Sequence, residues 1–138
     1  MDRCADQCMR GLSNAQTIGL ALAALLYVAA GTLHFVIPGA YLRIMPPYIP
    51  WQAPLVFITG GCEILGGLGL LVPQVRRYAA WGLIVLLIAV FPANIYMATN
   101  PVEAGAASIA PILRWGRLPL QLLLIWWLAW CTRHRSSA

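Results

Sequence analysis

The sequence predicts an all-α integral membrane protein, a four-helix transmembrane bundle that forms a single domain over residues 1–138. Of the 138 residues, 61% are hydrophobic and only 9% are charged, and the mean hydropathy is +0.76. Soluble domains carry about a quarter charged residues. The apolar residues also gather into four segments, each close to the roughly 20 residues that cross about 30 Å of hydrocarbon. Such a bundle uses nearly the whole chain, so no soluble catalytic domain fits beside it.

Four expected helices follow one another along the chain. They span residues 15–37, 54–72, 78–98 and 112–131. The first segment has an alternative interpretation as a signal peptide, because Val28-Ala29-Ala30 resembles a cleavage site. Its apolar run continues to Ile37, however, which favours a helix that stays in the protein.

The arginines determine the expected orientation, because cytoplasmic ends of membrane helices carry an excess of Lys and Arg. All nine of these basic residues are arginines, against four acids, which gives a net charge of +5. Six lie before the first helix, between the second and third, or after the fourth: Arg3, Arg10, Arg76, Arg77, Arg133 and Arg135. Three lie on the opposite side: Arg43, Arg114 and Arg117. We therefore expect a multi-pass protein of the bacterial cytoplasmic (inner) membrane with both termini in the cytoplasm.

The lipid bilayer is the first expected partner of the protein. Nucleic acid is not an expected partner, since the arginines form no basic stripe.

The two connections on the outer side differ in character. Prolines in residues 38–51 forbid a long helix, while Tyr41, Tyr48 and Trp51 are amphipathic rings that settle at the headgroup level. We expect this interfacial segment to lie along the membrane surface as a cap. Residues 99–111 are small and polar and are expected to form a flexible loop.

The four cysteines, Cys4, Cys8, Cys62 and Cys131, contain no C-x-x-C pair and no histidine spaced to complete a zinc site. We therefore expect no metal site and no disulfide framework. Cys4 and Cys8 would share one face of a helix and could hold a soft metal, but chance spacing is the favoured explanation. The chain has no haem, flavin, nucleotide or iron–sulfur motif, so it has no intrinsic cofactor. A redox role would need a diffusible quinone or a redox partner subunit.

Five polar side chains inside the expected helices form the candidate site: His34, Glu63, Asn94, Arg117 and Gln121. Counted at about 1.5 Å per residue, they lie roughly 5–14 Å below the outer helix ends. The inner half contains almost no polar side chain, so the sequence predicts a polar chamber above an apolar floor. A channel would need polarity through both leaflets. Pro92 and Pro119 lie beside the candidate residues and are expected to kink their helices, freeing carbonyls near Ile88 and Trp115.

Glu63 is the most demanding of these groups, because an unpaired carboxylate inside a membrane is expensive. Its neighbours three and four residues away in the helix are one threonine and three glycines, which let another helix approach closely. The side chain therefore points into the bundle. It is either protonated or paired, and Arg117 and His34 are the available partners.

Four stretches of the chain together resemble the DoxX-like family of small four-helix membrane proteins. They are GTLHFVIP (31–38), GGCEILGGLGLLVP (60–73), WGLIVLLIAVFPANIYMA (81–98) and LRWGRLPLQLLLIWW (113–127). The specific signal is the combination of G-x-x-H-F, E-I-x-G-G, P-A-N and R-x-P-x-Q. The resemblance implies four spanning helices in one compact bundle and places the family's recurring polar positions on the same five candidate residues. The family takes its name from a subunit of a thiosulfate:quinone oxidoreductase. The chain lacks the C-x-x-C of a dithiol redox member, so redox chemistry by its own thiols is not expected.

The leading hypothesis is that the cluster binds a small amphipathic molecule, a quinone or a lipid-like compound, as part of a membrane redox system. Glu63 would exchange a proton or a hydrogen bond with the ligand, and Arg117 would hold it ionised or contact an anionic group. The other three would orient the ligand: His34, Asn94 and Gln121. No residue is singled out as catalytic.

Two alternatives belong to other classes of protein. In the first, the polar network only fixes the bundle, and the chain is a structural or assembly partner of a membrane complex. In the second, the chain is a transporter, which would need a polar route through the apolar inner half.

Overall fold

The computed structural model describes residues 12–132, and this part of the chain is helical, with no strand. In chain order the helices are α2 (Asn14–Val36), α3 (Pro38–Ile44), α4 (Gln52–Leu71), α5 (Arg76–Thr99) and α6 (Pro111–Cys131). The all-helical prediction is confirmed. Each of the four long helices begins and ends within two residues of its expected range. Several residues of the charge and cysteine arguments lie outside the described residues: Arg3, Cys4, Cys8, Arg10, Arg133 and Arg135.

Three helices of the described part are long and apolar enough to cross a membrane, namely α2, α4 and α5. They contain 23, 20 and 24 residues, which corresponds to roughly 30–36 Å at the rise of an α-helix. That length matches the hydrocarbon thickness of a bilayer. Helix α6 has 21 residues, but Arg114, Arg117 and Gln121 lower the mean hydropathy of its first half. The chain is therefore a membrane protein with three clear candidate spans.

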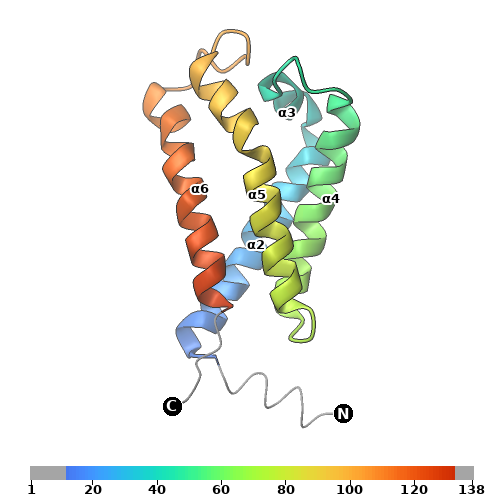
Figure 1. Cartoon of the computed structure of the whole chain (residues 1–138), viewed down its shortest axis with the longest axis vertical. Helices are drawn as coiled ribbons and strands as arrows, with labels where there is room; N and C mark the ends of the chain where they lie inside the picture. Colours follow the sequence, from blue (N-terminus) through green and yellow to red (C-terminus); the bar gives the residue numbers. More distant parts are fainter. Residues whose placement is uncertain (1–11, 133–138) are drawn as a thin grey trace.

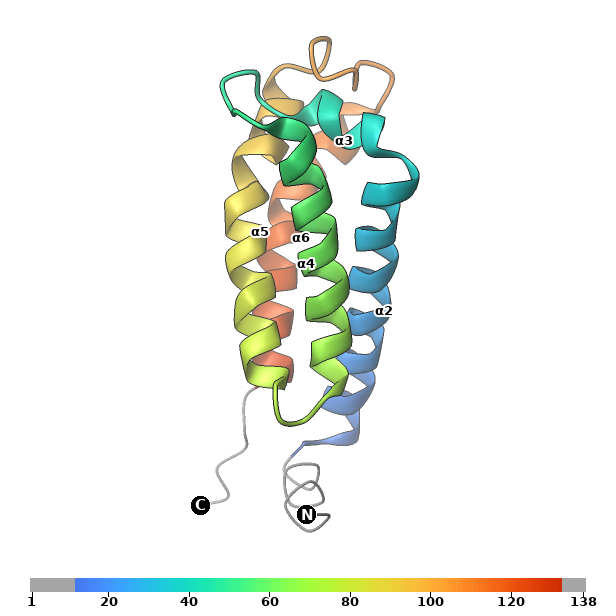
Figure 2. The ribbon, with the colours of Figure 1, turned by 90° about the vertical axis from the view of Figure 1, so that its right-hand side faces the viewer.

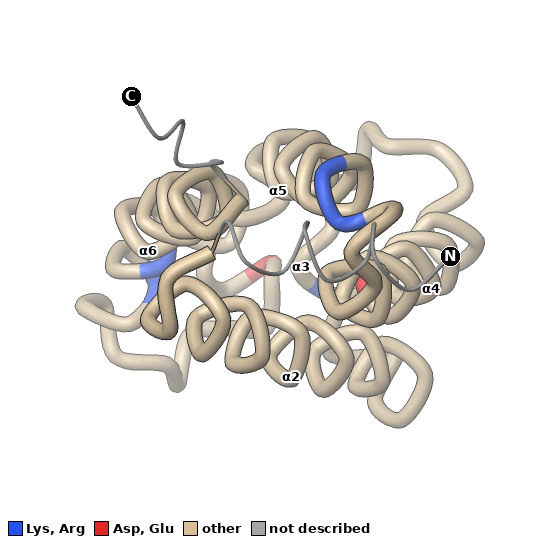
Figure 3. The backbone as a smooth tube through the Cα atoms, turned by 90° about the horizontal axis from the view of Figure 1, so that it is seen from below, with Lys and Arg blue, Asp and Glu red and all other residues tan. Residues whose placement is uncertain are grey.

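The four long helices lie side by side along a common axis (Figures 1 and 2). The start of α2, the end of α6 and the α4–α5 turn all lie at one end of the bundle, which we call the turn end. Helix α3 and residues 100–110 lie together at the opposite end, the α3 end. Contacts join α2 to α4, α4 to α5, α5 to α6 and α6 to α2, so the long helices close a ring in this order. Viewed from the turn end, α2 runs obliquely from the foot of α6 towards α4 (Figure 3).

Local sequence explains where α2 begins and how it is held against α6. The Ser13 hydroxyl accepts a hydrogen bond from the Gln16 backbone N–H at 3.2 Å, and the Gln16 side chain accepts one from the Ser13 N–H at 3.0 Å. This reciprocal pair is a capping box. The Gln16 amide also donates to the backbone oxygen of Trp130 at 3.1 Å. Gly19 allows the close approach, because a Cβ there would lie 2.7 Å from Cys131 Sγ. Helices α2 and α6 are thus held together at the turn end.

The main apolar core lies in the half of the bundle nearer the turn end. Its buried side chains come from all four long helices and include Leu20, Leu70, Leu83 and Leu128. This region corresponds to the apolar floor expected from the sequence. Lipid tails are as apolar as leucine, so the core stabilises the bundle through van der Waals packing between helices.

The α4–α5 turn is shorter than the sequence predicts. Arg76 and Arg77 are expected inside it, but in the structure they are the first two residues of α5. The Arg76 Nε donates to the carbonyl oxygen of Leu70 at 2.9 Å. This bond satisfies one of the carbonyls that the last turn of a helix leaves unpaired, which explains why Arg76 joins the helix.

The two connections at the α3 end, residues 38–51 and 99–111, are more ordered than irregular loops. Pro38 occupies the first position of α3, where its missing N–H is not needed. The expected flexible loop is packed, because Ala104 and Ala106 are buried against the end of α5. The Tyr96 hydroxyl also donates to the Glu103 carboxylate at 2.8 Å. Residues 99–111 are therefore attached to the bundle, contrary to the expectation.

Candidate functional site

Three polar side chains from α2 and α4 lie together inside the bundle and form what we call the Glu63 cluster: Tyr27, His34 and Glu63. Tyr27 and His34 are seven residues apart, which is two helical turns, so they share one face of α2. Both are buried. The Oε2 of Glu63 lies 3.6 Å from Nδ1 of His34, and Tyr27 lies within electrostatic reach of the same carboxylate. The structure thus unites two sequence-predicted residues, His34 and Glu63, with one that the sequence did not suggest.

The hydrogen bond of His34 shows where its proton lies. Nδ1 is 3.0 Å from the carbonyl oxygen of Ala30. A carbonyl only accepts hydrogen bonds, so Nδ1 carries a hydrogen and donates it, and Nε2 of the neutral ring is an acceptor. The distance of 3.6 Å from Nδ1 to the Glu63 oxygen is longer than a hydrogen bond. The contact is therefore an ion pair only when the imidazole is protonated on both nitrogens.

Two oxygens of the cluster are buried and have no hydrogen-bond partner in the described part of the chain. They are the hydroxyl of Tyr27 and Oε2 of Glu63. A buried polar group without a partner costs roughly 1–3 kcal/mol, and more when it is charged. The Glu63 side chain as a whole keeps 14% of its surface exposed. The cluster therefore contains a hydroxyl donor and a carboxyl acceptor whose hydrogen-bonding capacity no described residue satisfies.

Tyr41 of α3 covers the cluster from the α3 end. Its ring stacks on the His34 imidazole, with 3.7 Å between the ring centroids and 26° between the planes. Burial raises the pKa of Tyr41 above its ordinary value, the charge of Glu63 raises it further, and the charge of Arg117 opposes this rise. Tyr41 therefore lies near both charged groups, although these two groups do not pair with each other.

Arg117 is not placed as the ion-pair partner of Glu63. In the described part of the chain, the ion-pair contact of Glu63 is with His34, and Arg117 is exposed. One turn earlier on α6, Arg114 is half-buried, and its Nε has no hydrogen-bond partner. Of the two partners that the sequence offers Glu63, the structure brings one within reach.

The remaining candidate residues join α5 to α6. The Asn94 side-chain amide donates to Oε1 of Gln121 at 2.8 Å, and the buried Gln121 amide donates to the carbonyl oxygen of Leu87. That carbonyl lies one residue before the carbonyl that Pro92 deprives of its helical N–H. Within residues 12–132, no hydrogen bond or ion pair connects this bridge to the Glu63 cluster. The five candidate residues thus form two separate groups and an exposed arginine.

Two tyrosines of the site were not among the sequence-predicted site residues. Tyr27 carried a usable signal, because with Gly31 and His34 it forms a stripe at spacings of four and three along one helical face. Hydropathy counts its ring with the apolar residues, which hid the hydroxyl. Tyr41 was expected in the aromatic cap, but its stacking on His34 depends on how α3 lies across the bundle.

The chemistry open to the Glu63 cluster is hydrogen bonding and proton exchange. In the described part of the chain, no three His, Cys, Asp or Glu side chains gather as metal ligands. Cys62 is an exposed free thiol and Cys131 a buried one.

Long apolar helices around an apolar core, with a small buried polar cluster, define an all-helical integral membrane protein. Residues 22–133 match the model of the family described as Domain of unknown function (DUF8561), and the chain belongs to that family. The matched range contains the whole Glu63 cluster and the Asn94–Gln121 bridge. No curated protein and no solved structure matched the chain.

Proposed function

We propose that the protein crosses a bacterial cytoplasmic membrane four times and binds the polar group of a small amphipathic molecule of the quinone class at the Glu63 cluster. The observation that carries this proposal is the pair of buried oxygens without partners, the Tyr27 hydroxyl and Glu63 Oε2. Ionisable groups inside a membrane are rare and commonly belong to ligand or proton sites. The cluster therefore favours binding over a purely structural role.

The fourth span in this proposal is α6. Its 21 residues correspond to about 31 Å, which is long enough to cross the hydrocarbon. Residues 122–130 are apolar or aromatic, and the two arginines of the helix lie near the α3 end, where long side chains can reach the membrane surface. An even number of spans places both termini on one side.

The arginines support a cytoplasmic turn end. Within the described residues, two lie at the turn end and three at the α3 end: Arg76 and Arg77 against Arg43, Arg114 and Arg117. The excess at the turn end comes from four arginines of the two termini: Arg3, Arg10, Arg133 and Arg135. A reporter enzyme that is active only in the cytoplasm should work when fused to the C-terminus and fail when inserted between residues 99 and 111. The reverse pattern would refute this orientation.

The two unpartnered groups complement both redox forms of a quinone. A quinone carries carbonyl oxygens, to which the Tyr27 hydroxyl can donate. A quinol carries hydroxyls, from which the Glu63 carboxylate can accept. Neither bond disturbs the existing hydrogen bond of His34. The resemblance to the DoxX-like family supports a place in a membrane redox system, in which partner subunits would supply the electrons.

The test measures quinone binding to the purified protein in nanodiscs by titration calorimetry, with a short-chain benzoquinone as the probe. Tyr27→Phe and Glu63→Gln each remove one partner of the ligand. Each should raise Kd about five- to tenfold, because one hydrogen bond contributes roughly 1–1.5 kcal/mol. Tyr48→Phe is the matched control, since Tyr48 is exposed at the α3 end, and its Kd should equal that of the wild type. Identical Kd values in all variants would contradict the proposal.

A structural role in a membrane complex is the second candidate, and the Asn94–Gln121 bridge favours it. The bridge joins two helices through paired groups and needs no ligand. If the Glu63 cluster acts in the same way, replacing His34 and Glu63 together by leucine should preserve the thermal stability and the native assembly size. Replacing His34 alone should not, because it leaves a buried carboxyl without its neighbour. Absence of quinone binding to the wild type, together with a stable double variant, would establish this candidate.

A further inference from the structure

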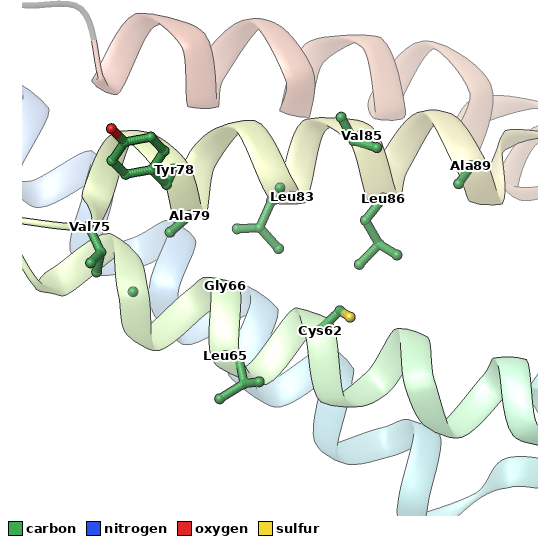
Figure 4. A pocket seen from close by; sticks show the side chains of 12 residues that line it. Cys62, Leu65, Gly66, Val75, Tyr78, Ala79, Leu83, Val85, Leu86 and Ala89 are labelled. Carbon is green, nitrogen blue, oxygen red and sulfur yellow. The ribbon is translucent and has the colours of Figure 1, made fainter.

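An apolar groove runs between α4 and α5 on the outside of the bundle (Figure 4). We call it the α4–α5 groove. It has a volume of about 530 Å³, within the roughly 300–1,000 Å³ range of small-molecule sites. Its walls include the exposed side chains of Leu65, Tyr78 and Val85. No residue of the Glu63 cluster lines it.

Glycines shape the α4–α5 groove. Near the turn end the two helices touch, because a Cβ at Gly69 would lie 2.8 Å from the Cβ of Ala79. At Gly82, by contrast, a Cβ would meet no atom within 4 Å, so the missing side chain leaves open space in the wall. From Val75 the helices diverge towards Cys62 and the middle of the bundle (Figure 4).

The α5 side of the groove is longer than one membrane leaflet. Its lining on the α5 side extends from Val75 to Ala89, which is about 21 Å along a helix. One leaflet of the hydrocarbon core is about 15 Å deep. A single lipid chain that starts at the membrane surface of the turn end would follow the groove to the middle of the bilayer.

The α4–α5 turn, where the groove begins, carries positive charge that no acidic residue of the described part of the chain compensates. Arg76 and Arg77 follow Val75 directly in the chain, and Arg76 is engaged with the carbonyl of Leu70. Arg77 is exposed and forms no ion pair with the described part of the chain. No acidic residue occurs between positions 64 and 99. An arginine at the membrane surface attracts anionic headgroups, and Tyr78, which is 78% exposed, is an aromatic ring suited to the same level.

We propose that the α4–α5 groove binds one anionic phospholipid, with an acyl chain along the apolar walls and the phosphate at Arg77. The apolar groove accounts for the binding of the acyl chain, and the exposed guanidinium of Arg77 accounts for the binding of the negatively charged phosphate. The site is separate from the Glu63 cluster, so either proposal can fail without the other.

The test compares phosphatidylglycerol with phosphatidylcholine as ligands of the reconstituted full chain. Native mass spectrometry counts the bound lipids, and spin-labelled lipids in phosphatidylcholine vesicles give the ratio of the two association constants. The wild type should retain one phosphatidylglycerol and prefer it over phosphatidylcholine. Arg77→Gln should lower this preference about five-fold, the effect of one arginine near an anionic surface. Arg43→Gln, at the α3 end, is its control and should not change the ratio.

A second variant tests the groove itself. Gly82→Leu fills the open wall and should abolish retention of the lipid while the helix content stays unchanged. Gly116→Leu is the matched control, because a Cβ at Gly116 also meets no atom within 4 Å and Gly116 does not line the groove. Retention of phosphatidylglycerol by Gly82→Leu, or an unchanged preference in Arg77→Gln, would overturn the proposal. The proposal would also be overturned if the wild type bound no lipid and formed a dimer that Gly82→Leu converted to a monomer. That result would assign the groove to a second copy of the chain.

Discussion

The backbone of Gly31 in α2 lies directly against the backbone of Gly60 in α4. A Cβ at Gly31 would be 2.6 Å from the carbonyl oxygen of Gly60, and a Cβ at Gly60 would be 2.6 Å from the Cβ of His34. Small residues allow membrane helices to approach in this way. This contact places His34 beside Glu63, so the geometry of the Glu63 cluster depends on two residues that have no side chain.

Gly31→Ala should therefore destabilise the protein. The added methyl would meet backbone, which cannot move aside, and overpacking of this kind costs about 1–3 kcal/mol. Gly61→Ala is the matched control, because a Cβ at Gly61 meets nothing within 4 Å, and alanine is the better helix former. Thermal unfolding in detergent should show a lower Tm for Gly31→Ala and an equal or higher Tm for Gly61→Ala. Equal Tm values in both variants would mean that α2 and α4 are farther apart than described.

The Asn94–Gln121 bridge should show energetic coupling between α5 and α6. Asn94→Leu and Gln121→Leu each leave the other amide with an unsatisfied group, whereas the double variant leaves neither. Interhelical hydrogen bonds in membrane proteins couple by about 0.6 kcal/mol on average, with values up to about 1.7. A double-mutant cycle on unfolding free energies should give a coupling in this range. A coupling of zero would show that the two amides do not bind each other.

The helices could be predicted from the sequence because a membrane span needs a long apolar run, and such runs are visible without any tertiary information. The positions of His34, Glu63 and Gln121 along their helices follow in the same way, because each helix begins and ends close to its expected range. What the sequence does not contain is the rotation of each helix about its axis. Arg117 was one of the two available partners that the sequence offered Glu63, yet it lies on an exposed face of α6.

The connections were harder to predict for a related reason. Residues 99–111 lack apolar periodicity, and their packing depends on small contacts such as the burial of Ala104 and Ala106. Tyr27 was missed because hydropathy describes its ring and ignores its hydroxyl. The division of the candidate site into two groups likewise depends on packing, because both groups lie at depths that permit a single chamber.

Tyr27→Phe should stabilise the protein when no ligand is bound. The hydroxyl is buried without a partner in the described part of the chain, and removing such a group recovers about 1 kcal/mol of its desolvation cost. Tyr96→Phe is the comparison, because the Tyr96 hydroxyl is bonded to Glu103 at the surface and its loss should leave the Tm nearly unchanged. Thermal unfolding with and without the short-chain benzoquinone separates the two effects. A Tyr27→Phe variant with a clearly lower Tm in the absence of ligand would mean that the hydroxyl already has a partner.

Gly105 holds the connection between α5 and α6 in its observed form. Its φ of +62° lies in the left-handed region, and a Cβ there would be 3.0 Å from Cδ of Arg43. Gly105→Ala should cost about 1–2 kcal/mol from the backbone conformation alone and should also displace Arg43. Limited proteolysis should cut the variant faster within residues 100–110, while the helices stay intact. Gly39→Ala is the control, since a Cβ at Gly39 meets no atom within 4 Å. Equal cleavage rates in both variants and the wild type would show that this connection is the flexible loop that its composition predicts.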